Sequence, residues 1–298
     1  VYAPPERIVV GAGTAALLGV LTSLLREVHS DIAVENPGFR LGRELFRNMG
    51  YGIVPVAIRQ GILDMDALER SGASLVYVSP SHQFPTGTVM PIGMRRQLLR
   101  WAEEREGVII EDDYDSELRY GKKPLPALSS YKDGAPCIYL GSFTKVIYPG
   151  FNMAYMVVPK SLIPIFEGAK LLMDRHSSEV HQYILAEFIQ NGFYYSHVRR
   201  LKKIYEKRRQ AAVRAIGKYL SGYGHIEGAN EGTHLTFIFN QPQDDVRLSE
   251  LLIRSYQIET RPLSACYRSA KALTGFILGY AHFKEEELEA AVFKLKEA

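Results

Sequence analysis

Short runs of aliphatic and β-branched residues alternate with helix-like segments through the first half of the chain, and this alternation restricts the possible folds more than any other feature. The expected buried strands are 8–10, 32–34, 75–78, 108–111, 137–140 and 154–158. Helical segments are expected at 15–26, 41–48 and 94–104. Such alternation predicts an α/β fold with a mostly parallel central sheet and helices on both faces.

The pattern changes after residue 177, where long amphipathic helices begin. A basic helix is expected at 195–218, with its Lys and Arg residues on a solvated face and its apolar residues at helical spacing. A strand, a helix, a second strand and a closing helix follow at 235–239, 251–256, 276–280 and 284–296. We therefore expect a large domain at 1–193 and a smaller C-terminal α/β lobe at 194–298.

Composition narrows the class of protein. With 298 residues and 46% hydrophobic content, the chain can bury a large core, and no apolar run reaches the roughly 18 to 20 residues of a membrane span. The segment 1–19 lacks the charged start of a signal peptide, so a cytoplasmic protein is expected. The chain enters a strand within ten residues of Val1, which suggests a fragment of a longer protein.

Charge and cysteine content argue against two further classes of site. The formal net charge of +3 is small and spread along the chain, so DNA contact would require a segment other than these residues. The only cysteines, Cys137 and Cys266, lie far apart without His or Cys at metal-ligand spacing. We interpret both as buried thiols and predict no metal site.

The most informative turn is Gly141–Lys145, "GSFTK", which follows the expected strand 137–140. It places Lys145 just past the carboxyl end of a parallel strand, the edge at which open α/β sheets bind ligands. The hydroxyls of Ser142 and Thr144 can reach a phosphate there. Taken alone, a serine and a lysine after a strand also occur by chance.

A second turn, Glu111–Asp115, also follows a buried strand. A carboxylate at this place can keep a pyridine nitrogen protonated, while a tyrosine hydroxyl binds the phenolic oxygen of the same ring. Acidic strand ends also bind Mg²⁺, but the chain has no phosphate-cradling Walker loop to support that alternative.

Two more turns lie at the same predicted edge. In Gly11–Ala15 a strand passes straight into a helix, so backbone N–H groups and the helix dipole can face a phosphate; a simple tight turn is the alternative. Ser79–Gly87 is a rigid turn that carries polar side chains, and by itself it is only a loop.

Together these four turns resemble, in order and across essentially the whole chain, the fold type I pyridoxal-phosphate enzymes of the aspartate aminotransferase family. The wording "SPSHQFPTGTVMP", "IIEDDYDSE" and "GSFTK" looks like the MocR/GabR group. That group consists of bacterial transcription regulators that join a winged helix-turn-helix to an aminotransferase-like, effector-binding domain. The resemblance implies a fold type I aminotransferase-like domain that binds pyridoxal 5'-phosphate.

The resemblance also assigns roles to individual residues. Lys145 would form the internal aldimine, Asp112 would pair with the pyridine nitrogen, and Tyr114 would contact the phenolic oxygen. The phosphate would be bound by Gly13, Thr14, Ser142 and Thr144. Phe39 matches an aromatic residue near the ring face, with a core phenylalanine as the alternative. His82 would contact the cofactor and Gln83 the effector.

The chain departs from the family pattern at its anion anchors. Asn152 stands seven residues after the lysine, where the family has an arginine that grips the phosphate. His282 and Leu41 stand where relatives carry arginines for a substrate or effector carboxylate. His282 is therefore a candidate effector contact, with a structural histidine as the alternative. Arg40 and Arg261 remain possible anion contacts, with surface arginines as the alternative.

These departures favour a sensor over an enzyme. The expected function is to bind an amine or amino-acid effector through Lys145, with residual transaminase activity possible. γ-Aminobutyrate is an unfavoured effector because both carboxylate anchors are missing. The alternatives are a catalytically active aminotransferase and a fold that has lost its cofactor. We expect a homodimer without membrane contact, and DNA binding only through a winged helix-turn-helix outside this chain.

Overall fold

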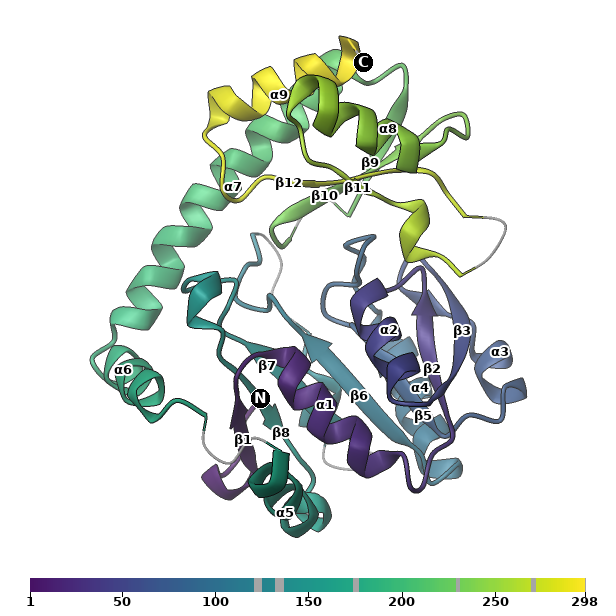
Figure 1. Ribbon diagram of the computed structural model, residues 1–298, viewed down its shortest axis with the longest axis vertical. Coiled ribbons are helices and arrows are strands. Elements are labelled where there is room, and N and C mark those ends of the chain that lie inside the picture. Colours follow the sequence, from purple (N-terminus) through teal and green to yellow (C-terminus); the bar gives the residue numbers. More distant parts are fainter. Residues whose placement is uncertain (121–124, 132–136, 174–176, 229–230, 269–271, 298) are drawn as a thin grey trace.

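Two sheets of unequal size organise the chain in the computed structural model, which describes residues 1–120, 125–131, 137–173, 177–228, 231–268 and 272–297 (Figure 1). The larger sheet has the strand order β1-β8-β7-β6-β5-β2-β3-β4. Its strands are β1 (Ile8–Gly11), β2 (Asp31–Asn36), β3 (Gly52–Arg59), β4 (Ile62–Leu63), β5 (Leu75–Val78), β6 (Val108–Asp113), β7 (Cys137–Ser142) and β8 (Ala154–Val157).

The large sheet is mostly parallel, as predicted. Strands β3, β2, β5, β6 and β7 run in one direction, whereas β8 is antiparallel to both of its neighbours, β7 and β1. A parallel pair needs a crossover, usually a helix. Between β7 and β8 the chain forms only turns and the 3-10 helix η3 (Pro149–Phe151), so β8 returns beside β7 in the opposite direction.

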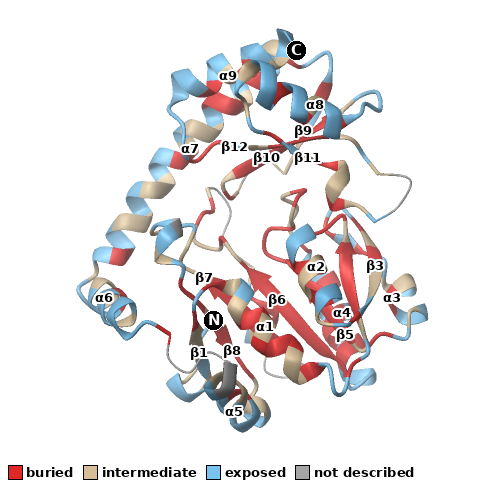
Figure 2. Cartoon of the chain, viewed as in Figure 1, coloured by how far each residue is buried: buried red, intermediate tan, exposed pale blue. Residues whose placement is uncertain are grey.

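Helices cover both faces of this sheet. On one face α1 (Thr14–Leu25), α2 (Arg40–Asn48) and α5 (Ile163–Met173) share a core with alternate strand residues such as Ile110. On the other face α3 (Met65–Arg70) and α4 (Ile92–Glu104) pack against the residues in between, such as Ile109. Figure 2 shows the resulting buried layer along the central strands. The period-two alternation of side chains thus separates two hydrophobic cores.

The smaller sheet is antiparallel, with the order β11-β12-β10-β9. Its strands are β9 (Gly224–Glu227), β10 (His234–Phe239), β11 (Arg261–Pro262) and β12 (Gly275–Gly279). Helix α6 (Glu179–Gln190) precedes the long helix α7 (Phe193–Tyr219). Helices α8 (Asp245–Leu251) and α9 (Glu285–Glu297) and a π-helical turn η5 (Leu252–Tyr256) accompany the small sheet. The domain boundary at 193/194 falls at the start of α7 and stays a prediction.

Helix α7 runs from the side of the large sheet to the small one (Figure 1). Its buried residues Tyr205, Ala212 and Ile216 pack with α9 and β10 in a third core, while Arg199 and Lys203 on the opposite face are exposed. The predicted amphipathic character of this helix is confirmed.

Both cysteines are buried free thiols, as predicted. Over the described ranges, no helix combines the length and the apolar character needed to cross a membrane. Within these ranges, no three or more His, Cys, Asp or Glu side chains are arranged to hold a metal ion.

Candidate functional site

The four predicted turns begin at one edge of the large sheet. The register pairs Asp113 of β6 with Gly141 of β7, so the turns after these two strands start side by side. Ala154 of β8 pairs with Gly11 on one side and with Ser142 on the other. The glycine turn before α1 and the turn that carries Lys145 therefore flank the start of the same strand.

Lys145 is exposed at this edge, and the next residue, Val146, fixes the backbone beside it. Val146 is fully buried beneath α7, and its carbonyl oxygen lies 2.7 Å from Nε2 of His197. The lysine side chain consequently points away from the core, and its positive charge acts on the carboxylate of Asp112. The amine thus lies outside apolar packing and within electrostatic range of the predicted ring-binding carboxylate.

Asp112 is buried near the end of β6 and accepts a hydrogen bond from the hydroxyl of Tyr77 on β5. Burial raises its pKa to about 7, a change that the Tyr77 hydrogen bond and the charge of Lys145 oppose and that nearby acidic groups reinforce. A buried carboxylate of this kind gains much from a cationic partner. The position suits a protonated pyridine nitrogen.

Tyr114, the second predicted ring contact, belongs to a buried hydrogen-bonded group. Its hydroxyl oxygen lies 3.1 Å from Nδ1 of His82, and the same Nδ1 lies 2.7 Å from Oδ2 of Asp115. Burial lowers the pKa of His82, but the charge and hydrogen bond of Asp115 outweigh it and the net pKa is raised. The structure thus brings His82 and Tyr114 together.

The predicted phosphate cradle lies at the start of α1. Gly13 precedes the helix with φ of 86°, a conformation that favours glycine, and its N–H donates to the carbonyl of Gly11 at 2.9 Å. On the facing turn, the Thr144 N–H donates to Oγ of Ser142 at 3.2 Å. Thr14 is the first residue of α1, whose first-turn N–H groups have no intrahelical acceptor.

Asn152 lies in this cradle, where the family pattern has an arginine. Its Nδ2 donates to the carbonyl of Ala12 at 3.2 Å, and a β-carbon built on Gly13 would lie 2.3 Å from its Oδ1. The cradle therefore accepts only glycine at position 13. An amide thus stands where the family pattern has a guanidinium.

An aromatic group borders the site. Phe39 packs edge-to-face on Phe84 at 5.7 Å between ring centroids, and Phe84 lies 6.4 Å from Tyr114 and 5.3 Å from His234. Phe39 is half-buried and packs against the core of the large sheet, and its place near a ring face stays a prediction.

His234, the first residue of β10, was missed by the sequence analysis. It enters from the small lobe, with Nε2 3.2 Å from the carbonyl oxygen of Pro85 and its ring 5.4 Å from that of His82. Burial and the charges of His82 and Lys145 lower its pKa to about 4. A lone histidine in a strand carries no sequence signal for such a position.

Gln83 is buried within its own loop. Its Nε2 donates to Oε2 of Glu35 at 3.2 Å and to the carbonyl of Pro37 at 2.8 Å, and its Oε1 accepts from the N–H of Thr86 at 3.1 Å. With 1% of its surface exposed, the side chain lies inside the loop rather than on the surface of the site.

The other candidate effector contacts lie near the small lobe. Arg40 is exposed at the start of α2, and one turn later Arg43 donates to the carbonyl of Cys266 at 3.1 Å. Burial raises the pKa of Cys266 to about 11, and the charges of Arg43, Arg40 and Arg261 oppose this change, so these arginines converge on one segment. His282 is exposed in the turn after β12, and no described contact joins it to the large-lobe site.

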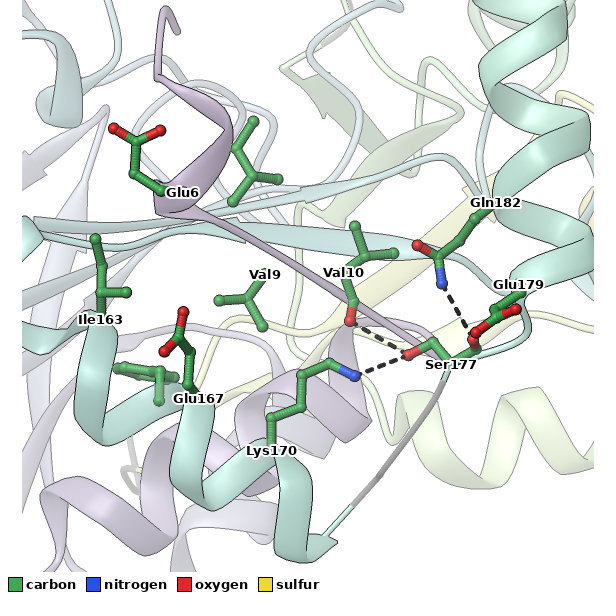
Figure 3. Close-up of a pocket in the computed structure, with 11 residues that line it drawn as sticks. Glu6, Val9, Val10, Ile163, Glu167, Lys170, Ser177, Glu179 and Gln182 are labelled. Atoms are coloured by element: carbon green, nitrogen blue, oxygen red, sulfur yellow. Dashed lines mark hydrogen bonds between the residues drawn. The ribbon is translucent and has the colours of Figure 1, made fainter.

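A separate cavity of about 390 Å³ lies beside the edge strand β1 (Figure 3). Lys170 of α5 donates to Oγ of Ser177 at 3.3 Å, and Ser177 donates to the carbonyl of Val10 at 3.2 Å. None of the predicted site residues lines this cavity.

Comparisons with known proteins identify the family of this chain. The model of the family "Aminotransferase class I and II" matches residues 2–295. The uncharacterized HTH-type transcriptional regulator YdeL of Bacillus subtilis is 33% identical over 298 residues, which are 100% of this chain and 64% of that protein. The probable rhizopine catabolism regulatory protein MocR of Rhizobium meliloti is 29% identical over 297 residues, which are 99% of this chain and 59% of that protein.

Among solved structures, LysN, the α-aminoadipate aminotransferase of Thermus thermophilus, superimposes with a TM-score of 0.90 at 25% identity. The match covers 99% of this chain and 77% of that chain, which was solved in complex with N-(5'-phosphopyridoxyl)-L-leucine. This chain belongs to the aminotransferase class I and II family, and the predicted fold type I architecture is confirmed. The chain spans less than two thirds of the length of the two regulators.

Proposed function

We propose that this chain is the pyridoxal-phosphate-binding, effector-sensing domain of a cytoplasmic bacterial regulator of the MocR/GabR type. The observation that carries the proposal is the exposed amine of Lys145 at the same sheet edge as the buried carboxylate of Asp112. The similarity to YdeL and MocR supports a regulatory rather than a metabolic setting.

The residues at the sheet edge fit the cofactor. Pyridoxal phosphate supplies an aldehyde that condenses with amines and a ring that withdraws electrons. Lys145 is the amine that would hold it, Asp112 would pair with its ring nitrogen, and Tyr114 would donate to its phenolic oxygen. The start of α1 and the turn after β7 would bind its phosphate, through Gly13, Thr14, Ser142 and Thr144.

Sensing is favoured over turnover because the carboxylate anchors have changed. For Lys145 to act as a base on a bound amino acid, the substrate must be fixed in orientation, and an arginine usually does so. Leu41 and His282 stand at the two expected arginine positions. Arg40 and Arg261, whose charges both act on the buried thiol of Cys266, are the cations proposed to contact an anionic effector.

The proposed assembly is a homodimer that binds DNA through a separate segment. Helix α6 exposes Val180, Tyr183 and Ile184 on one face, with 67%, 73% and 53% of their surfaces accessible. The first turn of α7 adds Phe193 and Tyr195. Several large apolar side chains exposed on one helix face are typical of protein–protein interfaces.

Spectroscopic titration tests the proposal and separates it from the aminotransferase alternative, which the similarity to LysN supports. The protein loaded with pyridoxal phosphate is titrated with D-alanine, an alanine dipeptide and γ-aminobutyrate while its visible absorbance is followed. We expect an effector amine to shift the band without forming keto acid or pyridoxamine phosphate, and γ-aminobutyrate to have no effect. Steady multiple turnover with a keto acid would establish the enzyme instead.

A further inference from the structure

His82 lies between two hydrogen-bonding groups of the turn that follows β6. Its Nδ1 is 2.7 Å from Oδ2 of Asp115 and 3.1 Å from the hydroxyl oxygen of Tyr114. All three residues are buried or half-buried, and His82 has only 2% of its surface exposed. One ring nitrogen thus serves two oxygen atoms of different chemistry.

The chemistry of the three groups fixes the position of one proton. A carboxylate accepts hydrogen bonds and does not donate, so the contact with Asp115 requires a proton on Nδ1 of His82. This holds for the neutral and the charged ring alike. A protonated Nδ1 cannot accept a hydrogen bond from Tyr114, so in this contact the tyrosine oxygen can only be the acceptor and the Nδ1–H group the donor. The hydroxyl proton of Tyr114 must then point away from His82.

We propose that Asp115 is a positioning residue: by keeping a proton on Nδ1 of His82, it prevents His82 from accepting the hydroxyl proton of Tyr114 and leaves that proton directed toward the phenolic oxygen of the cofactor. The inference rests on the proposed function, in which Tyr114 contacts that oxygen. It adds the reason why Tyr114 donates in this direction: the nearest alternative acceptor already carries a proton.

Close packing keeps the imidazole in this orientation. A β-carbon on Gly232 would lie 2.2 Å from Cε1 of His82, and one on Gly87 would lie 3.1 Å from its Nε2. The two glycines come from different lobes, so the ring is enclosed where the lobes meet. Turning the ring over would place a carbon atom opposite Asp115, which would then lose its donor. Among the described residues, Nε2 has no hydrogen-bond partner.

Charged groups around His82 change the pKa of its ring in both directions. Burial lowers the pKa of His82 and the charge of Arg119 lowers it further, but Asp115 and Glu231 raise it and the net pKa is raised. The ring of His234, from β10, packs at 5.4 Å. Around Tyr114, burial is the largest cause of its raised pKa, and Asp115, Asp112, Glu35 and Tyr77 add to it. The hydroxyl therefore stays protonated and acts as a donor.

The first test observes the proton itself in the cofactor-free chain. Nitrogen-15 NMR of labelled histidine is expected to show Nδ1 of His82 protonated, and Asp115→Leu should allow the form protonated only at Nε2. Assignment comes from the loss of one signal in His82→Phe. A wild-type ring protonated only at Nε2 overturns the proposal whether or not the cofactor binds.

The second test uses the pH midpoint of the visible band of the lysine-bound cofactor. A donor stabilises negative charge on the phenolic oxygen, so Tyr114→Phe should raise the midpoint by about one pH unit. Asp115→Leu should raise the midpoint similarly, because Nδ1 of His82 can then accept the tyrosine proton.

His82→Phe should change the midpoint little, because it removes the competing acceptor. The double variant His82→Phe with Asp115→Leu should therefore have a midpoint close to that of the wild type.

Glu111→Gln is the matched control, because Glu111 is a buried carboxylate that accepts from the backbone N–H groups of Leu128 and Ser129 rather than from His82. It should leave the midpoint unchanged. A wild-type midpoint in Asp115→Leu or in Tyr114→Phe, or no recovery in the double variant, overturns the proposal. Absence of any band in the wild-type protein contradicts the proposed function instead, and the NMR measurement then decides the state of His82.

Discussion

Oδ1 of Asn152 lies 2.3 Å from the point where Gly13 would carry a β-carbon, so the amide occupies the cradle in which the family pattern has an arginine. A charged donor should bind the cofactor phosphate more tightly, since hydrogen bonds to charged groups contribute roughly 1.5 to 3 kcal/mol. Asn152 has φ of 37°, and holding an arginine there costs about 1 to 2 kcal/mol.

Asn152→Arg is therefore expected to tighten pyridoxal phosphate binding by at most about thirtyfold. The dissociation constant from absorbance titration measures it. Asn152→Gln, which adds length without charge, is the control and should give no gain. Equal affinities for the arginine variant and the wild type would mean that Asn152 does not face the phosphate.

Gly13→Ala should weaken cofactor binding at least about tenfold, because alanine is strained at φ of 86° and its methyl group would displace Asn152. Combining it with Asn152→Gly removes the collision but not the strain, so affinity should recover in part. Gly19→Ala in the same helix, where a β-carbon has no neighbour within 4 Å, should bind normally. Normal binding by Gly13→Ala would contradict the cradle.

Asp112 should make the stability of the cofactor-free protein depend on pH. Its pKa is raised from 3.8 to about 7 in the folded chain, so the folded state holds the proton more tightly than the unfolded state. Stability then falls as pH rises from about 4 to about 7. Above that range, Asp112→Asn should stabilise the protein by roughly 1 to 4 kcal/mol, with little change near pH 4.

Denaturant unfolding at pH 4 and pH 8 measures this effect, with the exposed Glu69→Gln as control. The same Asp112→Asn variant should bind pyridoxal phosphate more weakly, because the ring nitrogen loses its carboxylate partner. Destabilisation by Asp112→Asn at pH 8 would show that the carboxylate is compensated in some other way.

The exposed face of α6 gives a prediction about assembly. Ile184→Arg places a charge in the proposed dimer contact and should yield a monomer in light scattering after size exclusion. Ile253→Arg is the control, since Ile253 is similarly exposed, at 49%, in the small lobe. A dimer that persists in Ile184→Arg but not in Ile253→Arg would move the interface to the small lobe.

The central strands and the site turns could be predicted because burial and chemistry left clear patterns. Strand β5 was predicted with its observed ends, Leu75 and Val78, since a fully buried strand is a continuous apolar run. Strand β3 was missed because Pro55 interrupts it and its burial is partial. Strands β4 and β11 contain only two residues each, too short to produce a pattern.

Site residues could be predicted where they lie in turns that directly follow predicted strands. Residues that the small lobe contributes to the site could not. Lys145 and Asp112 follow or end strands that pair in register. His234 meets His82, and the arginines meet Cys266, only through the packing of the small lobe against the large sheet. Single-sequence patterns do not encode this packing. Gln83 was predicted to contact the effector, and the structure adds that its side chain is buried within its own loop, which the sequence pattern did not indicate.

The central claim is that Lys145 is the amine that carries pyridoxal phosphate. The protein is incubated with the cofactor, reduced with borohydride and mapped by peptide mass spectrometry. The account predicts one phosphopyridoxyl group on the peptide containing Lys145, and no visible band in Lys145→Ala. Label scattered over surface lysines, or a band that survives in Lys145→Ala, would contradict it.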